Sequence, residues 1–116
     1  MKTDIKDRTY AFALEIIKFL DKLDKKDFIV DILSKQLLRS STSIGANILE
    51  AQAGSTRKDF INFYYYALKS SNETKFWLRL LKDSKKVQNH QTDQLLKEAE
   101  EISNILGACI ISLKKS

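Results

Sequence analysis

The stretch Arg39–Gly54, RSSTSIGANILEAQAG, decides the fold of this chain. On a helix of about 3.6 residues per turn, its polar residues share one face, because they recur at steps of three and four. These residues are Ser40, Ser43, Asn47 and Glu50, and an apolar face runs beside them through Leu37, Ile44, Ile48 and Ala51. A polar stripe next to an apolar one indicates a close helix contact with internal hydrogen bonds.

Outward from this stretch the sequence predicts four helices. We expect the first from about Asp4–Asp7 to Leu23, the second from Phe28 to Ala53, the third from Arg57 to Lys85 and the fourth from Thr92 or Asp93 to Lys114. Pro is absent and Gly occurs three times, so little interrupts long helices. Short connections between such helices favour an all-α, antiparallel up-down-up-down four-helix bundle, with residues 1–116 as a single domain.

Apolar spacing predicts which face of each helix is buried. In the first helix we expect Tyr10, Ala13 or Leu14, Ile17 and Leu20 to form the buried seam, with Phe12, Ile16 and Phe19 on a second flank that could meet another subunit. The third helix has a regular seam of Phe60, Tyr64, Ala67, Ser71, Thr74, Leu78 and Leu81, and Tyr65 and Trp77 lie off it as candidate subunit contacts.

Local signals mark the ends of these helices. Asp27 and Thr56 are expected to cap the second and third helices. The polar stretch Asp83–Thr92, DSKKVQNHQT, which holds the single histidine, His90, is expected to be a loop.

Composition narrows the class of protein. A chain that is 43% hydrophobic and 30% charged is an ordinary globular chain, and no apolar run approaches the roughly 20 residues of a membrane span. Acidic residues near the N-terminus argue against a signal peptide, so we expect a cytoplasmic protein with no membrane partner. One Cys, Cys109, and one His leave no catalytic or zinc constellation, and we expect no enzymatic activity, no metal and no cofactor.

The positive charge is concentrated on one segment. The net charge is +5, and residues 55–90 carry eight basic and three acidic groups. Such a segment favours a polyanionic partner. The candidate nucleic-acid-binding residues are Arg57, Lys58, Lys75, Arg79, Lys82 and Lys86, and the last four follow helical steps that place them in one stripe able to neutralise phosphates. Lys69 and Lys85 add to the same segment. A face that only keeps the protein soluble is the alternative.

Polar residues of the second and third helices form a second candidate site. A carboxylate at Glu73 inside a bundle needs donors, and Arg39 and the serines of the polar stripe supply them. We interpret the set as a structural clasp that fixes helix register, made by Arg39, Ser40, Ser43, Asn47, Glu50, Ser70 and Glu73. A small-ligand or enzyme site using Glu73, Asn47 and Arg39 is the alternative.

The central stretch also resembles a known family. Residues 38–50, LRSSTSIGANILE, are similar to the "LRRSAxSIxANIAEG" motif of the bacterial four-helix bundle proteins first found as reading frames within intervening sequences of large-subunit ribosomal RNA genes. Residues 56–60, TRKDF, resemble the family's "S-x-K-E-F", and Ala67, Ser70, Glu73 and Leu78 match its "AxGSxxExxxxL". This chain departs from the family at Gly45, where Pro is frequent, and at Lys69, Ala51 and Ala53, where Gly is frequent.

The resemblance implies a homopentameric barrel of four-helix bundles. It also implies kinship with the accessory proteins of diversity-generating retroelements, which associate with a reverse transcriptase and with RNA or DNA. We therefore predict a non-enzymatic oligomeric protein that contacts nucleic-acid phosphate through its third helix. A protein-interaction scaffold without nucleic-acid binding is the competing hypothesis.

Overall fold

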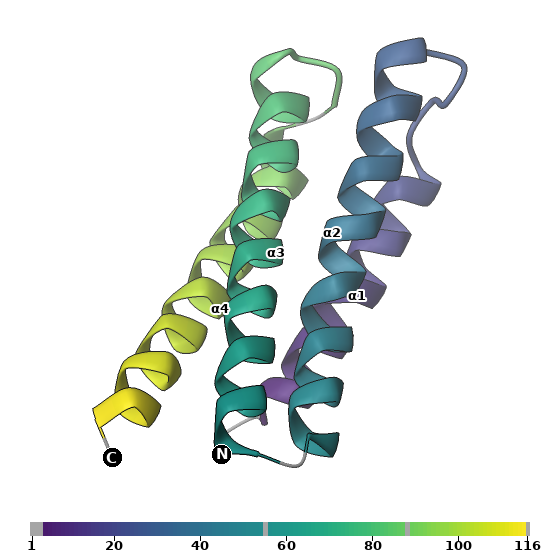
Figure 1. Cartoon of the computed structure of the whole chain (residues 1–116). Helices are drawn as coiled ribbons and strands as arrows, with labels where there is room; N and C mark the ends of the chain where they lie inside the picture. Colours follow the sequence, from purple (N-terminus) through teal and green to yellow (C-terminus); the bar gives the residue numbers. More distant parts are fainter. Residues whose placement is uncertain (1–3, 55, 88, 116) are drawn as a thin grey trace.

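Four long helices make up the part of the chain that the computed structural model describes, namely residues 4–54, 56–87 and 89–115. They are α1 (Ile5–Asp21), α2 (Phe28–Ala53), α3 (Arg57–Asp83) and α4 (Asn89–Lys115), and these residues contain no strand. The α1–α2 and α3–α4 connections lie at one end of the bundle, and the α2–α3 connection lies at the other (Figure 1). The bundle measures 48 × 24 × 22 Å.

The two predicted helix caps are confirmed. The Asp27 carboxylate accepts hydrogen bonds from the backbone N–H groups of Ile29 at 2.9 Å and Val30 at 3.1 Å. The Thr56 hydroxyl accepts one from the N–H of Asp59 at 3.0 Å. Both side chains satisfy donors that the first turn of a helix leaves without a partner, which is why α2 and α3 begin where they do.

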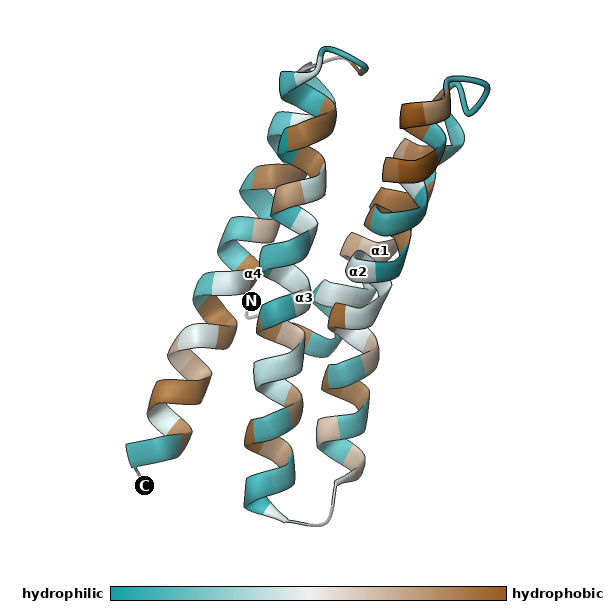
Figure 2. Ribbon diagram, turned by 45° about the horizontal axis from the view of Figure 1, so that its top comes forward, coloured by the Kyte–Doolittle hydropathy of each residue, from teal (hydrophilic) through white to brown (hydrophobic). Residues whose placement is uncertain are grey.

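The core confirms the predicted faces of α2 and α3 and corrects the face of α1. Phe12, Ile16 and Phe19 of α1 are buried, whereas Tyr10, Leu14 and Ile17 are exposed. Both flanks of α1 are apolar, so periodicity could not choose between them. Packing against α2 and α4 decides which flank of α1 is buried. Apolar residues line the inner sides of the helices and also the start of α2 (Figure 2).

The ends of the bundle differ from the sequence-based bounds. α1 ends at Asp21 and α3 at Asp83, each about two residues earlier than expected. α4 begins at Asn89, so His90 is an exposed helical residue and not part of a loop. Gln88 of the predicted loop lies outside the described residues. None of the described helices combines the length and the hydropathy that a bilayer crossing requires.

α1 and α2 approach closely at Gly45. A Cβ atom at this position would lie 3.3 Å from the Thr9 hydroxyl oxygen. Thr9 is fully buried and donates its hydroxyl to the Lys6 carbonyl at 3.1 Å, so it cannot turn away without losing that bond. Gly45 therefore serves the helix contact despite its low helix propensity.

Two glycine substitutions test this close approach. Gly107→Ala should raise the free energy of unfolding by about 0.5–1 kcal/mol, because alanine favours the helix and its Cβ would meet nothing within 4 Å. Gly45→Ala should raise the free energy of unfolding distinctly less, or should lower it, because the new Cβ would crowd the Thr9 side chain. Urea unfolding followed by circular dichroism measures both. Equal gains at the two positions would show that the Gly45 contact imposes no constraint.

Candidate nucleic-acid interface

Three of the four cations in the predicted stripe are held by carboxylates from other parts of the chain. The Lys75 ammonium lies 3.0 Å from Glu100, that of Lys82 lies 2.6 Å from Asp93, and that of Lys86 lies 2.9 Å from Asp27. The sequence could not indicate this pairing, because the three acids belong to α4 and to the cap of α2. Much of the charge of this stripe is therefore neutralised. Exposed pairs of this kind contribute only about 0–1 kcal/mol, so a phosphate can compete for the lysines.

The electrostatics at the end of α3 follow from these pairs. The Lys86 ammonium, with help from the N–H groups of the first turn of α2, holds the pKa of the Asp27 carboxyl below its usual range. The Asp93 carboxylate raises the pKa of Lys82. Arg79 is exposed and forms no ion pair with any described residue.

Arg57 and Lys58 lie at the opposite end of α3 from Lys82 and Lys86. The Arg57 guanidinium donates to the carbonyl of Leu113 at 2.7 Å, which ties the start of α3 to the end of α4. Lys58 is exposed. Near these two residues, the Lys114 ammonium of α4 lies 4.9 Å from the centre of the Tyr65 ring. The six predicted cations thus form two separate groups along a helix that is about 40 Å long: Arg57 and Lys58 begin it, Lys75, Arg79 and Lys82 lie in its last third, and Lys86 follows its end.

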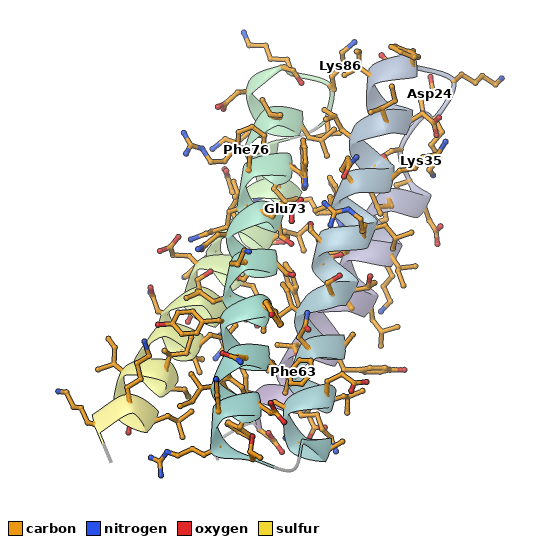
Figure 3. All side chains as sticks on the ribbon, in the orientation of Figure 1. Asp24, Lys35, Phe63, Glu73, Phe76 and Lys86 are labelled. Atoms are coloured by element: carbon orange, nitrogen blue, oxygen red, sulfur yellow. The ribbon has the colours of Figure 1, made fainter. Side chains whose placement is uncertain are left out.

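The clasp between α2 and α3 exists, with fewer members than predicted. Glu73 projects from α3 towards α2 and pairs with Arg39, which also donates to Gln36 (Figure 3). The hydroxyls of Ser40 and Thr74 are both buried and hydrogen-bond to each other at 2.9 Å. These two contacts join the helices at neighbouring positions and fix their register.

The other predicted members of the clasp do not bridge the helices. Ser43 donates to the Arg39 carbonyl and Asn47 to the Ser43 carbonyl, each at 2.8 Å within α2. Ser70 contributes only its carbonyl, which accepts from Thr74 at 2.8 Å, and Glu50 is exposed. Short polar side chains on a helix readily bond to the carbonyl one turn back, which explains the difference. Of the three residues of the alternative ligand site, Arg39 and Glu73 pair with each other at the surface, whereas the Asn47 amide donates to the Ser43 carbonyl within α2.

The sequence patterns did not identify two polar contacts of α3. Thr74 is the partner of Ser40, and Ser71 bonds to Ser103 of α4 at 2.7 Å and to the Ala99 carbonyl at 3.2 Å. The sequence did contain an indication of these contacts, because Ser71 and Thr74 lie on the predicted buried seam and a buried polar side chain needs a hydrogen-bond partner.

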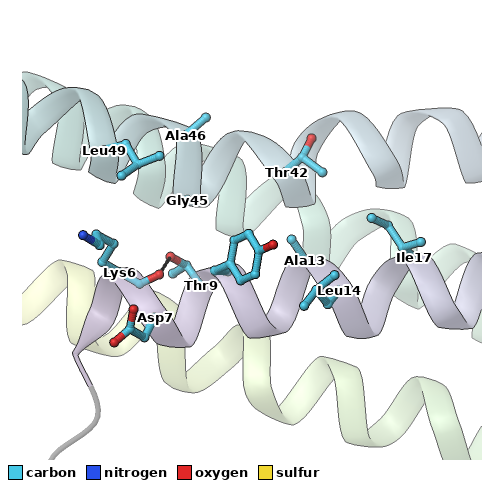
Figure 4. Close-up of a pocket in the computed structure, with 11 residues that line it drawn as sticks. Lys6, Asp7, Thr9, Ala13, Leu14, Ile17, Thr42, Gly45, Ala46 and Leu49 are labelled. Carbon is cyan, nitrogen blue, oxygen red and sulfur yellow. Dashed lines mark hydrogen bonds between the residues drawn. The ribbon is translucent and has the colours of Figure 1, made fainter.

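An apolar groove separates the outer sides of α1 and α2. Its volume is about 470 Å³, and it lies over the close approach of Thr9 and Gly45 (Figure 4). Tyr10, Leu14 and Ile17 line it from α1, and Leu49 lines it from α2. Tyr10 is 68% exposed and Leu49 is 54% exposed, so this isolated chain leaves large apolar side chains in water.

Comparisons with known proteins agree with the resemblance drawn from the sequence. The sequence model of the 23S rRNA-intervening sequence protein family matches residues 1–108. The chain belongs to this family. A crystal structure from Bacteroides thetaiotaomicron, described as a protein of unknown function from the S23 ribosomal protein family, is 38% identical. It superposes with a TM-score of 0.85 over 92% of this chain and 98% of its own. No match was found among curated proteins.

The family motif coincides with the helix contact that the structure resolves. Ser40 and Glu73, both motif positions, supply the two contacts between α2 and α3. Lys69, which replaces a frequent glycine of the motif, is exposed and does not lie at a close contact. The charge of Lys69 therefore faces solvent.

The buried hydroxyl pair provides a test of the clasp. Ser40→Ala and Thr74→Val should each lower the free energy of unfolding by about 1 kcal/mol, because each removes one member of a buried hydrogen bond. The double variant should lose less than the sum of the two. Thr42→Ala is the control, since Thr42 is exposed and bonds only within α2. Strictly additive losses in urea unfolding would contradict a coupled pair.

Proposed function

We propose that this protein is a non-enzymatic, oligomeric nucleic-acid-associated protein that contacts phosphate groups through α3. The observation that carries the proposal is the surplus of positive charge on this helix. Arg79 and Lys58 are exposed without an acidic partner among the described residues, and Lys75, Lys82 and Lys86 are held only by surface ion pairs. Phosphate contacts of this kind give affinity without reading base sequence.

Self-association completes this proposal. We expect the antiparallel bundle to assemble into a homopentamer, with the groove between α1 and α2 as a subunit contact. Exposed apolar residues at the groove support an interface, because burial of apolar surface contributes roughly 25 cal/mol per Å². A ring of five copies would repeat the α3 face around one assembly, which raises the avidity for a long polyanion.

A protein scaffold is the second candidate, and the same groove favours it. In this version the assembly presents its surface to another protein, and the charge of α3 serves solubility. The resemblance to retroelement accessory proteins makes a reverse transcriptase one partner to test. A partner that remains bound after nuclease treatment distinguishes this candidate from the first.

Charge removal on α3 tests the first candidate. The wild-type protein should bind RNA or DNA at low salt, with an affinity that falls linearly on a log–log plot against salt concentration. The double variant Lys58→Gln, Arg79→Gln should bind more weakly and with a slope reduced by up to about two. Lys18→Gln on α1 is the control, since Lys18 is exposed and pairs only with Glu15. Absence of binding even at low salt would contradict the proposal.

Charged substitutions in the groove test self-association. Leu14→Glu and Leu49→Glu should shift the mass measured by light scattering from the oligomer towards the monomer, because a carboxylate would be buried in the contact. Helicity should be unchanged, since both side chains are exposed in the isolated chain. Ile111→Glu, at a residue that is somewhat more exposed but lies on α4, should leave the mass unaltered. A monomeric wild-type protein would remove the oligomer from the proposal.

A further inference from the structure

The side of α3 opposite the core carries a regular stripe that differs from the predicted one. Seven residues recur at alternating steps of four and three, and all seven are exposed. We call this set the outer stripe: Lys58, Asn62, Tyr65, Lys69, Asn72, Phe76 and Arg79. It contains three cations, two aromatic rings and two amides, and no carboxylate.

The cations of the outer stripe remain available for a ligand. Lys58, Lys69 and Arg79 form no ion pair with any described residue. The neighbouring carboxylates of Glu73 and Glu100 are engaged by Arg39 and Lys75. Asp83, four residues after Arg79, is the next residue on this side of the helix, so the part of the stripe that has no carboxylate ends at Arg79.

The rings of the outer stripe are also accessible. Phe76 is 55% exposed and Tyr65 is 37% exposed, so both present aromatic surface to solvent. Phe76 meets the edge of Trp77 at 5.1 Å between ring centres, which fixes its orientation. Tyr65 carries the Lys114 ammonium 4.9 Å from its ring centre, which brings a further cation to the stripe.

The spacing along the helix is regular. Tyr65 and Phe76 are eleven residues apart, or about 16 Å at 1.5 Å per residue. Lys58, Lys69 and Arg79 are spaced by eleven and ten residues, so cations and rings alternate over about 32 Å. Asn62 and Asn72 lie between them. The Asn62 amide can contact a base edge, whereas the Asn72 amide oxygen already accepts from Ser103 at 3.2 Å and only its NH2 group can donate to a base.

We infer that the outer stripe binds a single-stranded nucleic acid, with its cations on the phosphates and with Tyr65 and Phe76 stacking on unpaired bases. This inference rests on the proposed function and specifies its ligand. Exposed rings distinguish single strands from duplexes, because the bases of a duplex are already stacked and cannot reach a protein ring. Cations alone would bind the phosphates of a single strand and of a duplex alike.

Binding of matched single strands and duplexes tests the inference. The probes are a labelled oligouridine RNA of about 20 nucleotides, longer than one binding site, its DNA equivalent, and RNA and DNA duplexes of the same length. Fluorescence anisotropy at several salt concentrations should show tighter binding of the single strands. Preference for the RNA or the DNA strand identifies the natural source, and either outcome supports the stripe.

Ring and charge variants should separate the two kinds of contact. The double variant Tyr65→Ala, Phe76→Ala should lower single-strand affinity about tenfold or more while leaving duplex affinity and the salt slope nearly unchanged. The triple variant Lys58→Gln, Lys69→Gln, Arg79→Gln should weaken both and flatten the slope. Phe28→Ala, which removes a ring 70% exposed on α2, is the matched control and should change neither.

The outcomes that overturn the inference differ from those that overturn the proposed function. If the ring variant binds single strands as tightly as the wild type while the charge variant is weakened, stacking is excluded and phosphate binding stands. If the ring variant changes the mass of the assembly in light scattering, Tyr65 and Phe76 belong to a subunit contact and the inference fails. Failure of the wild type to bind any probe overturns both.

Discussion

The bundle depends on one close contact, in which α2 and α3 meet through hydroxyl groups. Ser40 and Thr74 are fully buried and hydrogen-bond to each other, and the hydroxyl that accepts in this bond can donate its own proton to a carbonyl of its own helix. The bond between the two hydroxyls forms only in the register that brings Ser40 and Thr74 opposite each other, so it favours that register by about 1 kcal/mol. The Arg39–Glu73 pair lies one residue away at the surface and selects the same register.

This constraint assigns the three sides of α3. Its seam faces the core, and Ser71 adds a polar contact to α4. One flank faces α4, where Lys75 and Lys82 form ion pairs with carboxylates of that helix. The side opposite the core carries exposed rings and the cations that have no ion-pair partner among the described residues. It touches α4 where Lys114 lies over the Tyr65 ring and where Ser103 donates to the Asn72 amide oxygen. Packing therefore divides the cations of α3 into two groups: those on the flank towards α4, which are paired with acids, and those of the outer stripe, which are not.

The family assignment and the functional proposals rest on different residues. The motif that identifies the 23S rRNA-intervening sequence protein family includes Ser40 and Glu73, which hold the helices together. The residues proposed to bind nucleic acid lie outside these contacts. Lys69 is a departure from the family motif, and it adds a cation at the centre of the outer stripe.

The sequence by itself determined the helices, the caps at Asp27 and Thr56 and the buried faces of α2 and α3, because periodicity and capping are local properties. It also located the surplus charge on α3. Only the tertiary structure decided which flank of α1 is buried, since both flanks are apolar. The pairing of Lys75, Lys82 and Lys86 likewise depended on acids distant in sequence. The division of the polar stripe into a true clasp and self-bonded residues required knowledge of which side chains reach α3, and helical spacing does not contain that information.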